Sequence, residues 1–280
     1  MPSPSPFVVH SSGFRAMLGE FPTLELLVEN EAYPFAHEAG SSSGGQRVQL
    51  TKVHLGNGTS TSGPRTGVEC EELTVPIPMA NGGVNYKDGI LFCAQGSIDA
   101  SSGLNYMSSI PPYTTAVKAD FHGRPFNSVN HVVVHTDGSI WFTDPIYGHE
   151  QGYRPPPRLP NQVYRFDPET GSIRAMVDGF GRPNGICFSP DEQVVYVTDT
   201  DQPFLTNRSL SAMADTGILD GIKCDLDINV YSGCGDGPDI GGRGIANFCF
   251  GREGEMFLLN EYRLSRVHLT GGAKGALFGI

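Results

Sequence analysis

The sequence contains no long hydrophobic run. No stretch approaches the roughly 18 consecutive apolar residues that a membrane-spanning helix needs. The N-terminus, Met-Pro-Ser-Pro-Ser-Pro-Phe-Val-Val-His, also lacks a basic stretch followed by a long apolar one, so it does not read as a signal peptide. We therefore expect a soluble protein, with the cytoplasm favoured over secretion.

Basic residues are scarce. The chain has 19 Lys and Arg against 30 Asp and Glu, which gives a formal net charge of −11. Binding to a phosphate backbone needs a basic stripe on the surface, and the few basic residues do not cluster in this way. The composition argues against nucleic acid as a partner, and an acidic protein of this kind favours cations instead.

Metal-binding cysteine patterns are absent as well. None of the six cysteines has the paired spacing of a zinc site. Four of them (Cys93, Cys187, Cys224 and Cys249) occupy apolar, strand-like runs, where a small hydrophobic side chain is expected. We favour free, buried thiols, and disulfide bonds remain the alternative.

What the sequence does contain is a repeat. A polar residue, a strand, a tight turn and a second strand occur together five times, at residues 83–94, 130–144, 180–200, 220–233 and 246–259. Turns such as Asp88-Gly89 and Asp137-Gly138 favour hairpins, since both residue types tolerate positive φ. Units of about 40–50 residues with several antiparallel strands are typical of β-propeller blades.

The repeat predicts an all-β, six-bladed β-propeller. A sixth unit is indicated around Glu38, where Ser-Ser-Ser-Gly-Gly replaces the expected apolar strand, and the last copies are closely spaced. The first and the C-terminal blades are therefore expected to be trimmed. We assign residues 1–21 to an N-terminal arm and 22–280 to one domain, in which strand Thr23–Glu29 can close the ring by joining the last blade. No helical period of any length is evident.

In a propeller, one residue of each repeat unit is a candidate for function because of its position. The residue just before each inner strand of a propeller lies at one end of the central channel, and here these residues are Glu38, Gly82, Asn130, Asn184, Asp220 and Ala246. Four of the six carry oxygen donors. Two carboxylates and two amides suit Ca²⁺, whereas zinc would prefer His or Cys. The alternative is that Asn and Asp merely begin strands and turns here.

Several of these motifs resemble the gluconolactonase family, which includes senescence marker protein and luciferin-regenerating enzyme. They are Asn127-Ser-Val-Asn130, Asp137-Gly-Ser-Ile-Trp-Phe-Thr-Asp-Pro145, Asn184-Gly and Asp220-Gly-Ile. The similarity extends from about residue 35 to residue 269 and is strongest to the fungal lactonohydrolases. It implies a six-bladed propeller that opens lactones with a divalent metal, usually Ca²⁺, at one end of the channel.

The resemblance also implies a ligand set. The family's Glu, Asn and Asp ligands fall on Glu38, Asn130, Asn184 and Asp220, which are the oxygen donors found from the repeat. The chain departs from the family pattern in several places, of which two adjoin expected ligands. The family usually has Asn-Asp where this chain has Asn130-His131, and it continues with an apolar strand after Glu38.

The expected function is metal-dependent opening of a small sugar-acid or related lactone. In this hypothesis the metal polarises the carbonyl, and Asp220 is the preferred base. His131, Arg124 and Arg182 are candidates for substrate binding together with Asn130, although either arginine could instead form a salt bridge at the rim. His37 is a further candidate acid or base. Two alternatives stay open, namely a non-catalytic scaffold with a structural metal and a metal-dependent hydrolase of phosphoesters or organophosphates.

Overall fold

The computed structural model describes residues 12–33, 35–36, 48–55, 68–109, 114–201, 217–235, 244–252 and 254–276. Over these residues almost all of the regular secondary structure is β-strand, as predicted. Its strands are all paired antiparallel, and they form three four-stranded sheets and four two-stranded ones. The number of blades stays a prediction.

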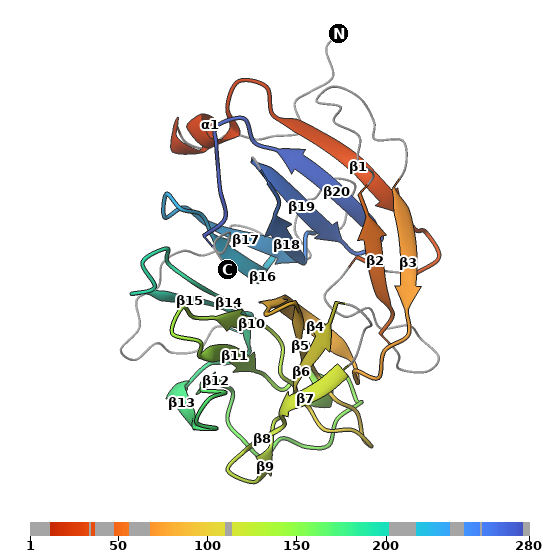
Figure 1. Cartoon of the computed structure of the whole chain (residues 1–280), viewed down its shortest axis with the longest axis vertical. Coiled ribbons are helices and arrows are strands. Elements are labelled where there is room, and N and C mark those ends of the chain that lie inside the picture. The colour runs from red at the N-terminus through yellow and green to blue at the C-terminus, as the bar shows by residue number, and fades with distance from the viewer. Residues whose placement is uncertain are drawn as a thin grey trace.

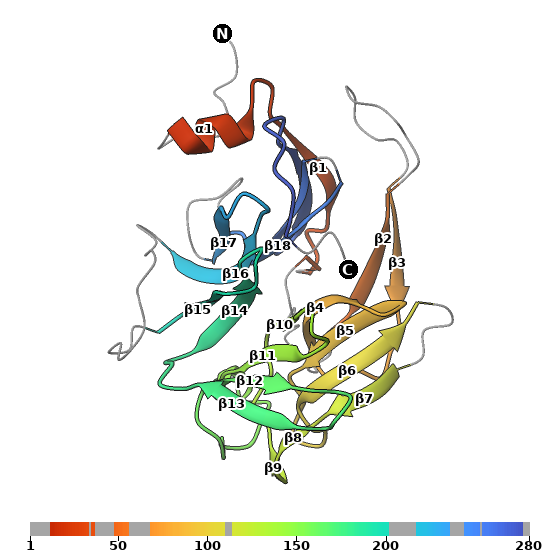
Figure 2. The same ribbon diagram turned by 60° about the vertical axis from the view of Figure 1, so that its left-hand side comes forward.

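Two of the four-stranded sheets are simple meanders, in which each strand pairs with the next one in the chain. The first contains β4 (Ala80–Tyr86), β5 (Gly89–Ala94), β6 (Gly103–Ser108) and β7 (Thr114–Lys118). The second contains β10 (Val132–Val134), β11 (Ile140–Asp144), β12 (Gln162–Phe166) and β13 (Ile173–Val177). In Figure 2 the order β4 to β7 runs outward from the middle of the molecule.

The third four-stranded sheet joins the two ends of the chain. It has the order β1 (Thr23–Glu29), β20 (Arg263–His268), β19 (Glu255–Asn260) and β18 (Asn247–Phe250). The prediction that strand Thr23–Glu29 joins the last unit is confirmed, because Thr23 pairs with His268 and Glu29 with Arg263. An ion pair between Arg263 and Glu29 reinforces the same join, with 2.6 Å between nitrogen and oxygen.

The remaining strands form pairs. These are β2 (Leu50–His54) with β3 (Glu69–Leu73), β8 (Asp120–Phe121) with β9 (Arg124–Pro125), β14 (Pro183–Phe188) with β15 (Val195–Asp199), and β16 (Ile218–Cys224) with β17 (Val230–Gly235). Figure 1 shows β4, β10, β14, β16 and β18 around the middle of the molecule. Contacts link β4 to β10, β10 to β14, β14 to β16, and β16 to β18, so these first strands form a central arc.

Helix is confined to two short segments of the described chain, α1 (Ser12–Leu18) and α2 (Tyr147–Glu150). The absence of a long helix agrees with the sequence, but α1 itself was not predicted. Its Leu18 is buried against Phe248 and Leu258 of the closing sheet. In the described part of the chain neither helix has the length and apolar character needed to cross a membrane.

The core lies between the sheets rather than at the centre. Its largest cluster surrounds Phe126, Phe142 and Tyr164, with the rings of Phe126 and Phe142 5.2 Å apart in an edge-to-face arrangement. All six cysteines are free. Cys93, Cys187 and Cys224 are buried as expected, whereas Cys249 is exposed. The apolar packing between sheets leaves the inner ends of the central strands for polar residues.

Candidate functional site

A β-bulge lies near the start of three central strands. In each, the register with the following strand shifts so that two residues face one: between Ala80 and Gly83 in β4, between Pro183 and Ile186 in β14, and between Leu219 and Ile222 in β16. The bulged pairs are Asn81-Gly82, Asn184-Gly185 and Asp220-Gly221. Bulges of this kind re-aim side chains and are frequent beside active sites.

The same bulge precedes β10. The Asn130 N–H donates to the carbonyl of Thr143, and the Thr143 N–H donates to the carbonyl of His131, both at 3.0 Å. Regular pairing then begins at Val132 with Phe142. Asn130-His131 is therefore the counterpart of the other three pairs, with histidine in place of glycine.

This register corrects one position in our reading of the sequence. We took Gly82 as the channel residue of its unit, but Gly82 aligns with Gly185 and Gly221, and Asn81 aligns with Asn184 and Asp220. Because residues 82 and 83 are both glycine, the sequence alone does not show where the bulge inserts its extra residue.

The glycines of the bulges let neighbouring sheets approach. A Cβ on Gly82 would lie 2.6 Å from the carbonyl oxygen of Asn130, and a Cβ on Gly185 would lie 2.6 Å from that of Asp220. Both distances are much shorter than a van der Waals contact, so a side chain at either position would clash with the backbone of the neighbouring strand. The Asn-Gly and Asp-Gly pairs therefore combine a polar side chain with the space that its neighbour requires.

Two threonines connect the bulges in series. Thr143 Oγ1 accepts the His131 N–H at 3.1 Å and donates to the carbonyl of Asn184 at 2.7 Å. Thr198 Oγ1 makes the same two bonds one sheet further along, accepting the Gly185 N–H and donating to the carbonyl of Asp220, both at 2.7 Å. The backbones of Asn130, Asn184 and Asp220 are thus held next to one another by two hydroxyls.

An aspartate follows each of these threonines and holds the loop before the bulge. Asp144 accepts the N–H groups of Asn127 and Ser128 at 3.0 and 2.7 Å. Asp199 accepts those of Gly181 and Arg182 at the same two distances. In both sheets the held residues lie three and two positions before the asparagine. The Thr-Asp pair therefore fixes the asparagine from both sides.

The two aspartates differ in their surroundings. Asp144 is fully buried, and this burial raises its pKa to about 7 even though the two N–H donors and Arg154 favour the charged form. Asp199 is only partly buried.

The amide oxygens at the bulges are buried without donors. Asn81, Asn130 and Asn184 are 8%, 3% and 6% exposed, and no described residue donates a hydrogen bond to any of their three Oδ1 atoms. Buried polar atoms are usually paired, so three unpaired oxygens at equivalent positions indicate a ligand. Asn184 is oriented by its other amide atom, because Nδ2 donates to the Tyr147 hydroxyl at 3.4 Å.

The donor chemistry fits a hard cation. Amide oxygens that accept no hydrogen bond from a described residue, and the partly exposed carboxylate of Asp220 on a neighbouring bulge, are the kind of oxygen donors that Ca²⁺ prefers. Glu38, the other expected carboxylate ligand, lies outside the described residues, as does His37. The structure thus places three of the four residues expected as ligands at bulges of adjacent strands, with Asn81 at the bulge of a fourth strand.

His131 is buried and reaches across to another sheet. Its side chain is 2% exposed, and its Nε2 lies 2.9 Å from Nζ of Lys223 in β16. Lysine can only donate, so Nε2 is the acceptor and the ring proton of a neutral His131 belongs on Nδ1. Lys223 was not singled out from the sequence, where its only signal is a charged residue inside the apolar run of β16.

The two arginines are placed differently. The Arg182 guanidinium binds Glu150 through Nη2 at 2.9 Å and Asp201 through Nη1 at 3.3 Å, which is the rim salt bridge that we considered as the alternative. Arg124 is exposed in β9, in the small hairpin at the end of the molecule opposite α1 (Figure 1). Arg124 is therefore not gathered with the bulge residues.

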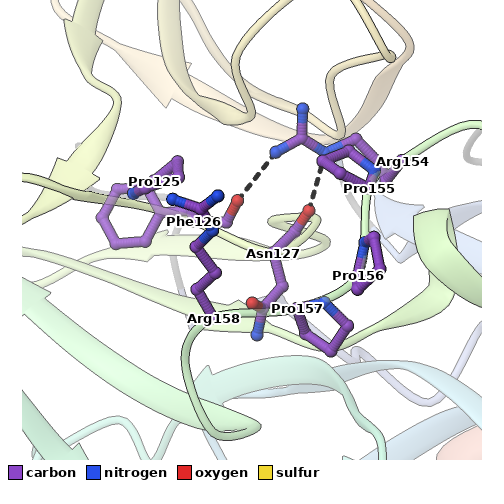
Figure 3. A pocket seen from close by; sticks show the side chains of 8 residues that line it. All are labelled: Pro125, Phe126, Asn127, Arg154, Pro155, Pro156, Pro157 and Arg158. Atoms are coloured by element: carbon purple, nitrogen blue, oxygen red, sulfur yellow. Dashed lines mark hydrogen bonds between the residues drawn. The ribbon is translucent and has the colours of Figure 1, made fainter.

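A pocket of about 530 Å³ lies beside the loop that leads to Asn130 (Figure 3). It is lined by Pro125, Phe126, Asn127, Arg154, Pro155, Pro156, Pro157 and Arg158. Arg154 donates to the carbonyls of Asn127 and Phe126, both at 2.9 Å, and to those of Ser97 and Ala100. Its guanidinium supports the loop, and no bulge residue lines this pocket.

Comparison with known sequences gives matches over much of the chain. The profile of the SMP-30/Gluconolactonase/LRE-like region matches residues 49–242. A lactonohydrolase of Aspergillus oryzae is 34% identical over 138 residues, which are 46% of this chain and 32% of that protein. A gluconolactonase of Zymomonas mobilis is 26% identical over 216 residues, 60% of this chain and 58% of that protein. The chain thus spans between about a third and three fifths of these relatives.

A solved structure shares the fold over nearly the whole length. Regucalcin of Agrobacterium tumefaciens, a calcium-binding protein, superimposes with a TM-score of 0.54 at 18% identity, covering 92% of this chain and 94% of that one.

Proposed function

Because this chain belongs to the SMP-30/Gluconolactonase/LRE-like family, we propose that it is a hydrolase that opens small lactones. The relatives named for lactonohydrolase and gluconolactonase activity support this reaction class, with a sugar-acid or related lactone as substrate. One structural observation carries the proposal for this chain. Four aligned β-bulges place one carboxylate and three amide oxygens, to which no described residue donates, near the starts of adjacent strands.

We assign Ca²⁺ as the cofactor, with Glu38, Asn130, Asn184 and Asp220 as its ligands. Calcium binding by the structural relative regucalcin and the all-oxygen donor set both support this assignment. A bound Ca²⁺ supplies positive charge that polarises the lactone carbonyl. Another divalent cation with the same preference for oxygen could take its place.

The protein's own residues supply orientation and proton transfer. The Asp220 carboxylate takes a proton from a water molecule as the water oxygen attacks the carbonyl carbon. The ring C–O bond then breaks, and the departing oxygen takes up a proton, which leaves a hydroxy acid. Asn130 and Asn184 hold the substrate carbonyl and the cation in place, because the Thr143 and Thr198 hydroxyls fix the backbone at their bulges.

The proposed active site lies where the central strands begin, at the mouth of the channel of a six-bladed propeller. Of the four residues expected to bind substrate, Asn130 is best placed for the role, because it lies at a bulge and no described residue donates to its buried amide oxygen. Arg182 could contact substrate only if its pair with Glu150 opened, and His131 is held against Lys223. Arg124 has no part in the proposal.

The direct test is to measure lactone opening by the purified protein in a pH-stat. The panel should contain five- and six-membered sugar lactones, with aryl phosphotriesters as the comparison class. We expect lactones to be opened, the activity to disappear with chelator and Ca²⁺ to restore it. Hydrolysis of phosphotriesters alone, or no hydrolysis by a protein that binds Ca²⁺ tightly, would refute the proposal.

A further inference from the structure

Among the polar residues of the four bulges, Asn81 is the one to which neither the family resemblance nor the repeat assigned a role. It occupies in β4 the place that Asn184 has in β14 and Asp220 has in β16, since the register shift falls at the same position in all three strands. Side chains at equivalent positions of equivalent bulges leave the strand in corresponding directions. The Asn81 side chain is therefore directed toward the same end of the central strands.

The burial of Asn81 supports this placement. The side chain is 8% exposed, and no described residue donates a hydrogen bond to its Oδ1. An asparagine that only began a strand would keep its oxygen in water or pair it with a backbone N–H. Asn81 shares this unusual state with Asn130 and Asn184, the two asparagines already assigned to the cation.

The backbone holds Asn81 next to Asn130. The Gly82 N–H donates to the carbonyl of Asn130 at 3.0 Å, and Gly82 leaves no room for a side chain between the two strands. The order along the central arc is therefore Asn81, Asn130, Asn184 and Asp220, each beside the next. Four oxygen-bearing side chains therefore occupy equivalent bulge positions on four strands that neighbour one another.

We propose that Asn81 is a further ligand of the cation site, contributing its Oδ1 to the Ca²⁺ shell. This inference rests on the proposed function only in that it concerns the same cation. Ca²⁺ takes six to eight oxygen ligands, so a shell of Glu38, Asn130, Asn184 and Asp220 leaves room for a fifth protein oxygen. A neutral amide adds coordination without adding charge.

The test is the dissociation constant for Ca²⁺, measured by calorimetry on the full chain. Asn81→Leu keeps the approximate volume and removes the oxygen, and it should raise the dissociation constant at least about tenfold. Its melting temperature in chelator should be unchanged or higher, because an unpaired buried amide is removed. The matched control is Asn85→Leu at an exposed position of the same strand, which should bind Ca²⁺ like the wild type.

A merely structural role for Asn81 predicts the opposite pattern, with a lower melting temperature in chelator and an unchanged dissociation constant, and that result would overturn the inference. If Asn81→Leu does not fold, Asn81→Asp provides the test. A negative charge placed among the ligands should lower the dissociation constant for Ca²⁺. An unchanged dissociation constant would refute the role of Asn81 as a ligand. Failure of the wild type to bind Ca²⁺ would instead contradict the assignment of the cation as a whole.

Discussion

The hydroxyl of Thr143 donates a 2.7 Å hydrogen bond to the backbone carbonyl of Asn184, which lies 41 residues further along the chain in the next sheet. Thr198 has the same relationship to Asp220. Each threonine also accepts an N–H from the bulge of its own sheet. The backbones of the proposed ligands are therefore linked through these hydroxyls, and we expect a change at one bulge to shift the next.

Removal of the Thr198 hydroxyl should disturb this connection. Thr198→Val leaves the buried Gly185 N–H and one acceptor site on the Asp220 carbonyl unpaired, so we expect a loss of about 1–3 kcal/mol in the free energy of unfolding. Ca²⁺ binding should weaken several-fold as well. Urea denaturation and calorimetry would measure the two effects.

Thr198→Ser retains the hydroxyl and should restore Ca²⁺ binding to within about twofold of the wild type. Thr115→Val, at an exposed position of β7, is the control for valine in a strand. Equal Ca²⁺ affinity in Thr198→Val and the wild type would show that the hydroxyl has no part in positioning the ligands.

The close approach at Gly185 gives a second prediction. In Gly185→Ala the new Cβ would meet the Asp220 carbonyl at 2.6 Å and the Ile222 nitrogen at 2.8 Å, and neither backbone atom can move without shifting β16. Overpacking of this kind costs about 1–3 kcal/mol, and Ca²⁺ affinity should fall with it. Gly235→Ala is the matched control for the melting temperature alone, since the nearest atoms there, the Ile218 carbonyl oxygen and an Asp220 carboxylate oxygen, are 3.8 and 3.9 Å away. Similar melting temperatures for the two variants would contradict the described approach.

The raised pKa of Asp144 leads to a prediction of how the free energy of unfolding depends on pH. Burial raises its pKa to about 7 in the folded protein, whereas the ordinary value is 3.8. Between these values the folded state keeps a proton that the unfolded state has lost, so unfolding releases it. Stability should therefore fall with rising pH by up to about 1.4 kcal/mol per unit over this range, relative to Asp144→Asn, which cannot ionise.

Denaturation of both proteins at pH 4.5, 5.5, 6.5 and 8 would reveal this difference. The advantage of the wild type over Asp144→Asn should be greatest at the lowest pH and should level off above about pH 7. An advantage that grows with pH would mean that the N–H groups of Asn127 and Ser128 and the charge of Arg154 outweigh burial.

Much of the fold could be predicted from the sequence because the repeat and its turns are local signals. The closing strand β1 was predicted with its observed limits, and the polar residues at Asn130, Asn184 and Asp220 were found from the start of each unit. Asn81 was missed by one position, because a bulge adds a residue that strict alternation cannot locate.

One further feature of the sequence could have predicted part of the site, whereas others have no local signal. The Thr-Asp dipeptide ends both β11 and β15, and this recurrence could have indicated the shared hydrogen bonds of Thr143 and Thr198. The contact between His131 and Lys223 joins residues 92 positions apart and has no local signal. Helix α1 has seven residues, too few to show a helical period, and forms against the closing sheet.

The measurement that tests the central claim most directly compares Asp220→Asn with Asn184→Ala in lactone opening as Ca²⁺ is titrated to saturation. We predict that Asp220→Asn stays nearly inactive, because the proposed base is gone, whereas Asn184→Ala regains part of its activity as its weakened site fills. Equal recovery of both variants, or full activity of both without added Ca²⁺, would contradict the account.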